Sequence, residues 1–148
     1  MHQYILWKEL GALRITLKPP LPVPVQGSRV AKSMQPGFVS FAPATKKKVQ
    51  DKFTFPKAAV MNVSANRLGA FLITSKTEFS FSEFNEKKEK VKSMDLKFDP
   101  EMKKLLMLFT YADLNGEYSC ELELEEGEWH FIKELVRSCI PLASGFTV

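Results

Sequence analysis

Phenylalanines interleaved with lysines are the feature of this sequence best suited to binding chemistry. The rings are Phe38, Phe41, Phe53 and Phe55, and the ammonium groups are Lys46, Lys47, Lys48, Lys52 and Lys57. Lysines along a phosphate backbone and rings under unstacked bases are the combination that holds single-stranded nucleic acid. Strand alternation must turn most of these rings toward a core, so we expect one or two to be exposed.

Roles for these residues follow from their chemistry. We predict that phosphates are contacted by Lys46, Lys47, Lys48 and Lys52, with Lys57 beside them. We predict that Phe53 or Phe55 stacks on bases, and Phe38 is a further candidate. Binding of this kind is largely independent of base sequence and weakens with salt.

Residues that could support catalysis or hold a metal are sparse. The carboxylates at 117, 121, 123 and 125 share one strand face, which reads as a solvated face that could also take up a basic arm of another protein. His130 follows Trp129 at a predicted helix start, and Cys139 lies on an apolar helix stripe, so both are expected to be structural. The phosphate-binding, dinucleotide-binding, zinc-protease and serine-hydrolase motifs are missing from the sequence. We therefore predict a protein that is not an enzyme and uses neither a cofactor nor a metal.

Charge is distributed unevenly along the chain. The whole sequence has 21 basic and 17 acidic residues, whereas residues 1–76 hold 12 basic and 2 acidic ones. The first half is therefore strongly basic, and the second half carries a net negative charge. Residues 113–128 contain seven acids and no base. This segregation suggests a polyanion-binding face and a separate face that is either solvated or meets a basic partner.

Length and composition indicate one globular domain spanning residues 1–148, either soluble or peripheral to a membrane. The hydrophobic fraction of 45% and the charged fraction of 26% are ordinary for such a domain. No apolar run approaches the roughly 20 residues that span a bilayer. The two cysteines are too few for a disulfide scaffold and fit a reducing compartment.

Local patterns predict two sets of strands, each followed by a helix. In the first half, strands are expected at 10–18, 28–34, 37–41 and 53–57, with a Pro-rich connector at 19–26 that serves as a linker or as an arm lying on a neighbouring subunit. A helix is expected at 64–74, with Ser64 as its N-cap.

In the second half, strands are expected near 79–82, 91–98, 105–109 and 117–125, separated by an exposed loop at 86–90 and a hairpin turn at Asn115-Gly116. The run 105–109 reads as a strand buried on both faces. A last helix is expected at 127–140, ending before Pro141. Antiparallel meanders with helices on one side make an α+β domain.

The order of these motifs resembles the Whirly family of plant organellar proteins that bind single-stranded DNA. Residues 36–44 (PGFVSFAPA) look like the family's Gly-Phe-Val strand that ends in Phe-Ala-Pro-Ala. Residues 7–20 resemble its Lys-Gly-Lys-Ala-Ala-Leu strand and the Pro-Pro that follows, and residues 63–69 resemble its helix start. The final helix and residues 140–146 are similar to its C-terminal region. Of the Lys-Gly-Lys element only Lys8 remains, followed by Glu9.

The resemblance implies two antiparallel four-stranded sheets packed crosswise, with two helices that form the centre of a homotetramer. It adds Lys8 to the nucleic-acid-binding candidates and implies a mitochondrial location, with the plastid as the alternative. Trypanosomatid guide-RNA-binding proteins share this fold, so both single-stranded DNA and RNA stay open as ligands.

Two further hypotheses remain beside a free nucleic-acid-binding protein. The first is a structural subunit of a mitochondrial ribosome or another ribonucleoprotein particle. Its basic half would touch RNA, and the acidic face at 117–128 would meet a basic protein. The second is a protein-interaction module that does not bind nucleic acid.

Overall fold

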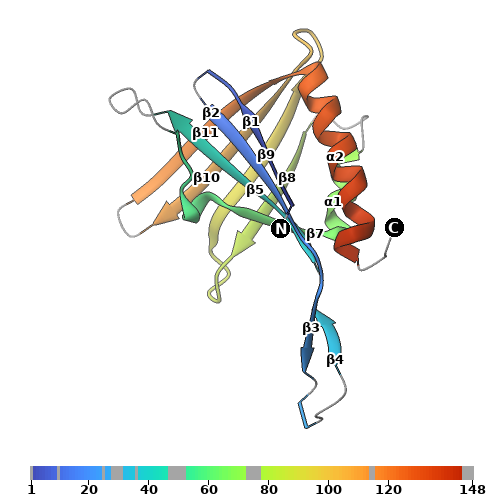
Figure 1. Cartoon of the computed structure of the whole chain (residues 1–148). Helices are drawn as coiled ribbons and strands as arrows, with labels where there is room; N and C mark the ends of the chain where they lie inside the picture. The colour runs from blue at the N-terminus through green and yellow to red at the C-terminus, as the bar shows by residue number, and fades with distance from the viewer. Residues whose placement is uncertain are drawn as a thin grey trace.

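Two antiparallel sheets crossed over a common core form the body of the protein, and one long helix lies along their side (Figure 1). The computed structural model describes residues 2–9, 11–24, 26–27, 32–35, 37–46, 53–72, 78–113 and 116–144. The predicted architecture of two four-stranded sheets and two helices is confirmed. Among the described residues, no helix combines the length and apolar character needed to cross a membrane.

The N-terminal sheet is four strands wide. Its order is β1 (His2–Trp7), β2 (Gly11–Lys18), β5 (Phe38–Lys46), and then two short strands that share the last position. These are β6 (Phe53–Thr54) and β7 (Met61–Ser64), which pair with opposite ends of β5. A 3₁₀ turn, η1 (Lys57–Ala59), connects them. The alternation on β2 is as predicted, whereas β1 was not predicted, because its residues do not alternate in polarity.

The C-terminal sheet is a meander of four longer strands: β8 (Glu78–Phe84), β9 (Lys90–Asp99), β10 (Lys104–Asp113) and β11 (Gly116–Glu125). All four were expected, and the predicted loop before β9 is a turn of exposed residues. The prediction that residues 105–109 are buried on both faces is wrong. Leu105, Met107 and Phe109 are buried, but Leu106 and Leu108 are only half-buried, since nothing in the described chain covers the second face of this sheet.

Helix α2 (Glu126–Ser144) closes the side of the body and extends beyond its predicted end. Pro141 lies inside the helix rather than after it. The last turn is held by tertiary contacts: Ala143 is fully buried, and its carbonyl accepts a hydrogen bond from the Gly37 amide at 3.1 Å. Packing therefore overrides the helix-breaking tendency of proline.

The first helical segment is shorter than predicted. α1 (Ala65–Leu68) is a single turn that continues as the 3₁₀ turn η2 (Gly69–Leu72). Ser64 occupies the N-cap position, but its side chain makes no capping hydrogen bond. Gly69, whose helix propensity is low, lies where the α-helix ends. Part of the predicted range, residues 73–74, is outside the described residues.

A hairpin arm projects from the body (Figure 1). Its strands are β3 (Leu21–Pro24) and β4 (Lys32–Gln35), and they pair with each other. The segment predicted as a Pro-rich connector therefore contains one strand of this arm. The base of the arm is tightly packed, because a Cβ added at Gly37 would lie 2.5 Å from the Lys18 carbonyl oxygen and 2.9 Å from that of Ala143. Backbone atoms cannot yield as a flexible side chain can, so glycine is required there.

The core lies between the two sheets and against α2. The N-terminal sheet contributes Leu13, Ile15 and Phe41, and the C-terminal sheet contributes Met94, Met107 and Phe109. Helix α2 adds Ile132 and Val136. The sides of the sheets that face away from this core are called their outer faces below.

Candidate nucleic-acid interface

Basic, aromatic and uncharged polar side chains share the outer face of the N-terminal sheet. Arg14, Thr16 and Lys18 alternate along β2 with the buried residues Leu13, Ile15 and Leu17, so they point away from the core. None of the five strands of this sheet carries an aspartate or glutamate. Strands without carboxylates favour an anionic ligand. A carboxylate from the other sheet reaches the edge strand β7, where Glu83 accepts a hydrogen bond from the Asn62 amide at 3.4 Å.

Each of the two cations of β2 lies over a phenylalanine ring. The guanidinium carbon of Arg14 is 4.5 Å from the centroid of the Phe55 ring, and the Lys18 ammonium is 5.6 Å from that of Phe38. Cation–π contacts of this kind fix the charged group beside the ring. Each pair therefore presents a positive charge and an aromatic surface together.

Uncharged hydrogen-bonding groups cross the same face. Register places Gln3 opposite Thr16, Thr16 opposite Ser40, and Ser40 opposite Asn62. The Ser40 hydroxyl donates to the Asn62 side-chain oxygen at 2.6 Å. Gln3, Thr16 and Ser40 of this row, with Arg14 and Lys18, line a hollow of about 310 Å³. Thr16 and Ser40 are themselves buried, with 6% exposure each, so the face offers mainly charge and ring surface to a flexible polyanion.

The predicted site residues fall into three groups. Phe38 and Phe55 lie on this face as described, and Lys57 is exposed on η1 next to it. Lys46 and Phe53 face each other in the β5–β6 ladder, and their side chains are outside what the structure describes. Lys47, Lys48 and Lys52 also lie outside the described residues, so their role stays a prediction.

Lys8 forms an ion pair with Glu128 of α2. It lies in the turn between β1 and β2, at the end of β2 opposite to Lys18, and its ammonium is 2.5 Å from a carboxylate oxygen of Glu128 on α2. The same carboxylate accepts the Glu125 amide at 3.0 Å. Lys8 therefore joins the sheet to the helix start, and its charge is compensated.

Arg14, Lys18 and Trp7 were missed as binding candidates. The sequence did indicate Arg14 and Lys18, because they are polar residues that alternate with apolar ones along the clearest strand pattern of the chain. Trp7 is 57% exposed and lies on the same outer face, but its strand β1 was not predicted. Burial raises the pKa of both cysteine thiols, Cys120 and Cys139, which suits the structural role expected for Cys139.

Solved structures with this arrangement are known although sequence similarity is low. The chain is similar to the plant transcriptional regulator PBF-2, at a TM-score of 0.76 and 14% identity over 98% of this chain and 91% of that one. WHY3 from Arabidopsis thaliana gives a TM-score of 0.76 and 17% identity over 99% and 90% of the two chains. Trypanosoma brucei MRP1/MRP2 gives 0.59 and 8% identity over 97% and 85%.

By sequence alone, neither a family model nor a curated protein matches the chain. The relation to known proteins therefore rests on structural similarity alone. It confirms the Whirly-like fold that was predicted from the order of motifs.

Proposed function

We propose that this chain, which has a Whirly-like fold, binds single-stranded nucleic acid along the outer face of its N-terminal sheet and catalyses no reaction. The carrying observation is the pair of cation–ring contacts, Arg14 with Phe55 and Lys18 with Phe38, on a sheet without carboxylates. Phosphates would meet Arg14, Lys18 and Lys57, and unstacked bases would meet the rings. Lys46, Lys47, Lys48 and Lys52 would extend the phosphate contacts, and Phe53 would add another ring.

The ligand is single-stranded because the rings need unpaired bases. A duplex buries its base faces in its own stack, whereas a single strand can turn them toward Phe38 and Phe55. The match to the plant transcriptional regulator PBF-2 supports a nucleic-acid ligand. The test is binding of labelled single-stranded DNA, single-stranded RNA and duplex competitors across a salt series. Preference for duplex, or affinity insensitive to salt, would contradict the proposal.

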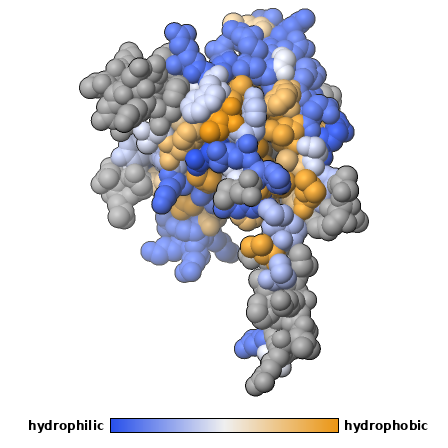
Figure 2. Space-filling view, viewed as in Figure 1, coloured by the Kyte–Doolittle hydropathy of each residue, from blue (hydrophilic) through white to orange (hydrophobic). Residues whose placement is uncertain are grey.

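We also propose that the protein works as a homotetramer joined through α2. Phe131 is 49% exposed on this helix and packs against Tyr4 with ring centroids 5.0 Å apart and ring planes inclined by 48°. Beside them an apolar hollow of about 230 Å³ opens between β1 and α2, lined in part by Leu135 and Leu142. Figure 2 shows hydrophobic residues gathered on this side of the body. Light scattering should give about four times the 16.8 kDa chain mass, and a Phe131→Lys variant should give smaller species.

A second candidate function is a fixed subunit of a mitochondrial ribosome or similar ribonucleoprotein particle. The hairpin arm supports it, since Leu21 is 60% exposed there and an isolated two-stranded hairpin is marginally stable in water. The acidic strand β11 would then meet a basic protein. Such a subunit should co-sediment with RNA in fractionated mitochondria, whereas a free protein should purify as a soluble tetramer. Plastid fractions are the corresponding test of the alternative location.

A further inference from the structure

A pair of stacked tyrosines marks one end of the C-terminal sheet. Tyr111 on β10 and Tyr118 on β11 face each other in register, with ring centroids 5.5 Å apart and planes inclined by 23°. They follow the core side of the sheet one row beyond Phe109 and Cys120, which are buried. Tyr118 is nevertheless 42% exposed. The pair thus continues the apolar rows of the core and leaves aromatic surface exposed to solvent.

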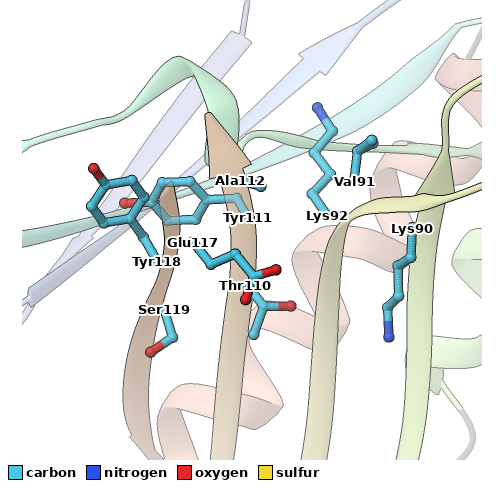
Figure 3. A pocket seen from close by; sticks show the side chains of 9 residues that line it. All are labelled: Lys90, Val91, Lys92, Thr110, Tyr111, Ala112, Glu117, Tyr118 and Ser119. Carbon is cyan, nitrogen blue, oxygen red and sulfur yellow. The ribbon is translucent and has the colours of Figure 1, made fainter. Parts of the chain in front are cut away.

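A hollow of about 400 Å³ adjoins this pair. Figure 3 shows the two rings overlapping on one side of it and two lysines of β9 on the other, with the side chains of Lys90 and Lys92 pointing in opposite directions. The lining also includes Thr110 on β10 and Ser119 on β11, which face each other in register on the opposite side of the sheet from the tyrosines. A space of this size accommodates a nucleotide.

The charged residues of the lining lie on both faces of the sheet. Lys92 is neutralised by Glu83, whose carboxylate oxygen is 3.2 Å from its ammonium. Lys90 is exposed, and no residue in the described ranges forms an ion pair with it. The lining also contains the carboxylate of Glu117 on the strand of Tyr118. Lys92 pairs in register with Tyr111 and shares the face of the tyrosines, whereas Lys90 pairs with Phe84 across a register shift and lies on the opposite face. The tyrosine pair therefore offers ring surface rather than charge to a ligand.

The pair is also connected to the proposed nucleic-acid interface. The turn η1, which carries exposed Lys57, packs against β10. Phe55, two residues before Lys57, holds the contact with Arg14. A strand leaving Arg14 and Phe55 thus meets a cation on η1 before it reaches the tyrosine strand pair.

We propose that Tyr118, backed by Tyr111, is a second base-stacking site that takes one unstacked base of a bound single strand. This inference rests on the proposed function. The same nucleic-acid strand that binds the N-terminal sheet would also contact the C-terminal sheet. A structural cross-strand pair alone would stabilise the β10–β11 hairpin without affecting ligand binding.

The test measures fluorescence anisotropy of a labelled single-stranded oligothymidylate with the full chain. Tyr118→Leu should weaken binding roughly tenfold, because one base–ring stack is lost. Tyr118→Phe keeps the ring and should bind like the original protein. Equal affinity of the leucine and phenylalanine variants would overturn the inference.

A second measurement does not depend on a variant that folds. Ultraviolet crosslinking of a 5-bromodeoxyuridine oligonucleotide to the unmodified protein should yield adducts on the peptide that contains Tyr118. Adducts confined to the peptides of β2, β5 and β6 would overturn the inference while supporting the proposed function. If the unmodified protein binds no single strand, the proposed function itself fails. If an Arg14/Lys18 variant loses affinity and Tyr118→Leu does not, the second base-stacking site is refuted and the proposed function still holds.

Discussion

The two sheets supply similar side chains to the core and opposite charges to the solvent. Strands of the N-terminal sheet contain no carboxylate, whereas those of the C-terminal sheet contain nine, four of them on β11. On the outer face of the C-terminal sheet, Lys97 and Lys104 are matched by Glu78 and Glu123 at 3.7 and 2.5 Å. On the N-terminal sheet, Arg14 and Lys18 lie over rings instead.

The difference shows how one fold can separate stability from binding. Inward positions on both sheets must be apolar, since they share one core. Outward positions are free of that requirement, so their chemistry can follow a ligand or a partner. The contrast between the two outer faces is therefore the strongest guide to function in this molecule, and it can be tested at several levels.

The largest effect, a loss of stability, is expected for substitutions in the core that the two sheets share. Phe41 of the N-terminal sheet and Phe109 of the C-terminal sheet are both almost completely buried. Replacing either by alanine should lower the free energy of unfolding by about 3–5 kcal/mol, because each leaves a cavity in the shared core. Urea denaturation checks this. A cost below about 1 kcal/mol at one of them would mean that the two sheets do not share a single cooperative core.

Charge reversal on the outer face of each sheet should affect single-strand binding differently. Arg14→Glu/Lys18→Glu should weaken single-strand binding about 100-fold or more, because two attractive charges become repulsive. The matched control, Lys97→Glu/Lys104→Glu on the C-terminal sheet, should stay close to the original affinity. Anisotropy titrations over a salt series measure both, and the slope of log affinity against log salt should fall by about 1.4 in the first variant only. Equal losses in the two variants would refute the assignment of the ligand to the N-terminal sheet.

The aromatic part of the interface should give an intermediate effect. Phe55→Leu removes a ring while keeping an apolar side chain beside Arg14, and should reduce affinity for single strands about tenfold with little change in the salt slope. Phe84, 62% exposed on β8, offers a control on the other sheet. Phe84→Leu should bind normally in the same titration. An unchanged affinity of Phe55→Leu would leave the basic residues as the whole interface.

The smallest effect concerns an ion pair of the acidic face. Hydrogen bonding and charge attraction from Glu123 raise the pKa of Lys104 above its ordinary value. A raised pKa in the folded state means that the pair stabilises the protein fully below the unfolded-state pKa and loses this contribution as pH rises through the folded value. Glu123→Gln should therefore lower the pKa of Lys104 in an NMR titration and leave stability near neutral pH almost unchanged. A pKa that does not move would show that the pair is not formed in solution.

Much of the fold could be read from local patterns. Alternation along 10–18 and 117–125 predicted β2 and β11, and the apolar stripe of Trp129, Ile132 and Val136 predicted α2. The order of short motifs predicted the Whirly-like architecture, which single motifs could not. Strand β1 was missed because its polarity does not alternate, and α1 was predicted too long because Gly69 lies where the α-helix stops.

The candidate site was predicted in part. Phe38 and Phe55 lie on the outer face of the N-terminal sheet and Lys57 lies next to it on η1, so their binding role stays a prediction. Lys8 is instead paired with Glu128 across 120 positions of sequence. No local pattern reports such a distant pairing. Arg14 and Lys18 were visible as the polar half of β2, but their partners Phe55 and Phe38 come from other strands. The tyrosine pair likewise required the β10–β11 register.

The sequence by itself determined which side of each strand is apolar and where basic and acidic residues are concentrated, because both are properties of neighbouring positions in the chain. Tertiary structure decided which strands lie next to each other, and therefore which cation lies over which ring. It also decided that α2 continues through Pro141, since burial of Ala143 and its bond to Gly37 outweigh a local preference. Contacts between distant segments depend on how the sheets cross, and that arrangement is fixed by the packing of the whole core rather than by any one segment.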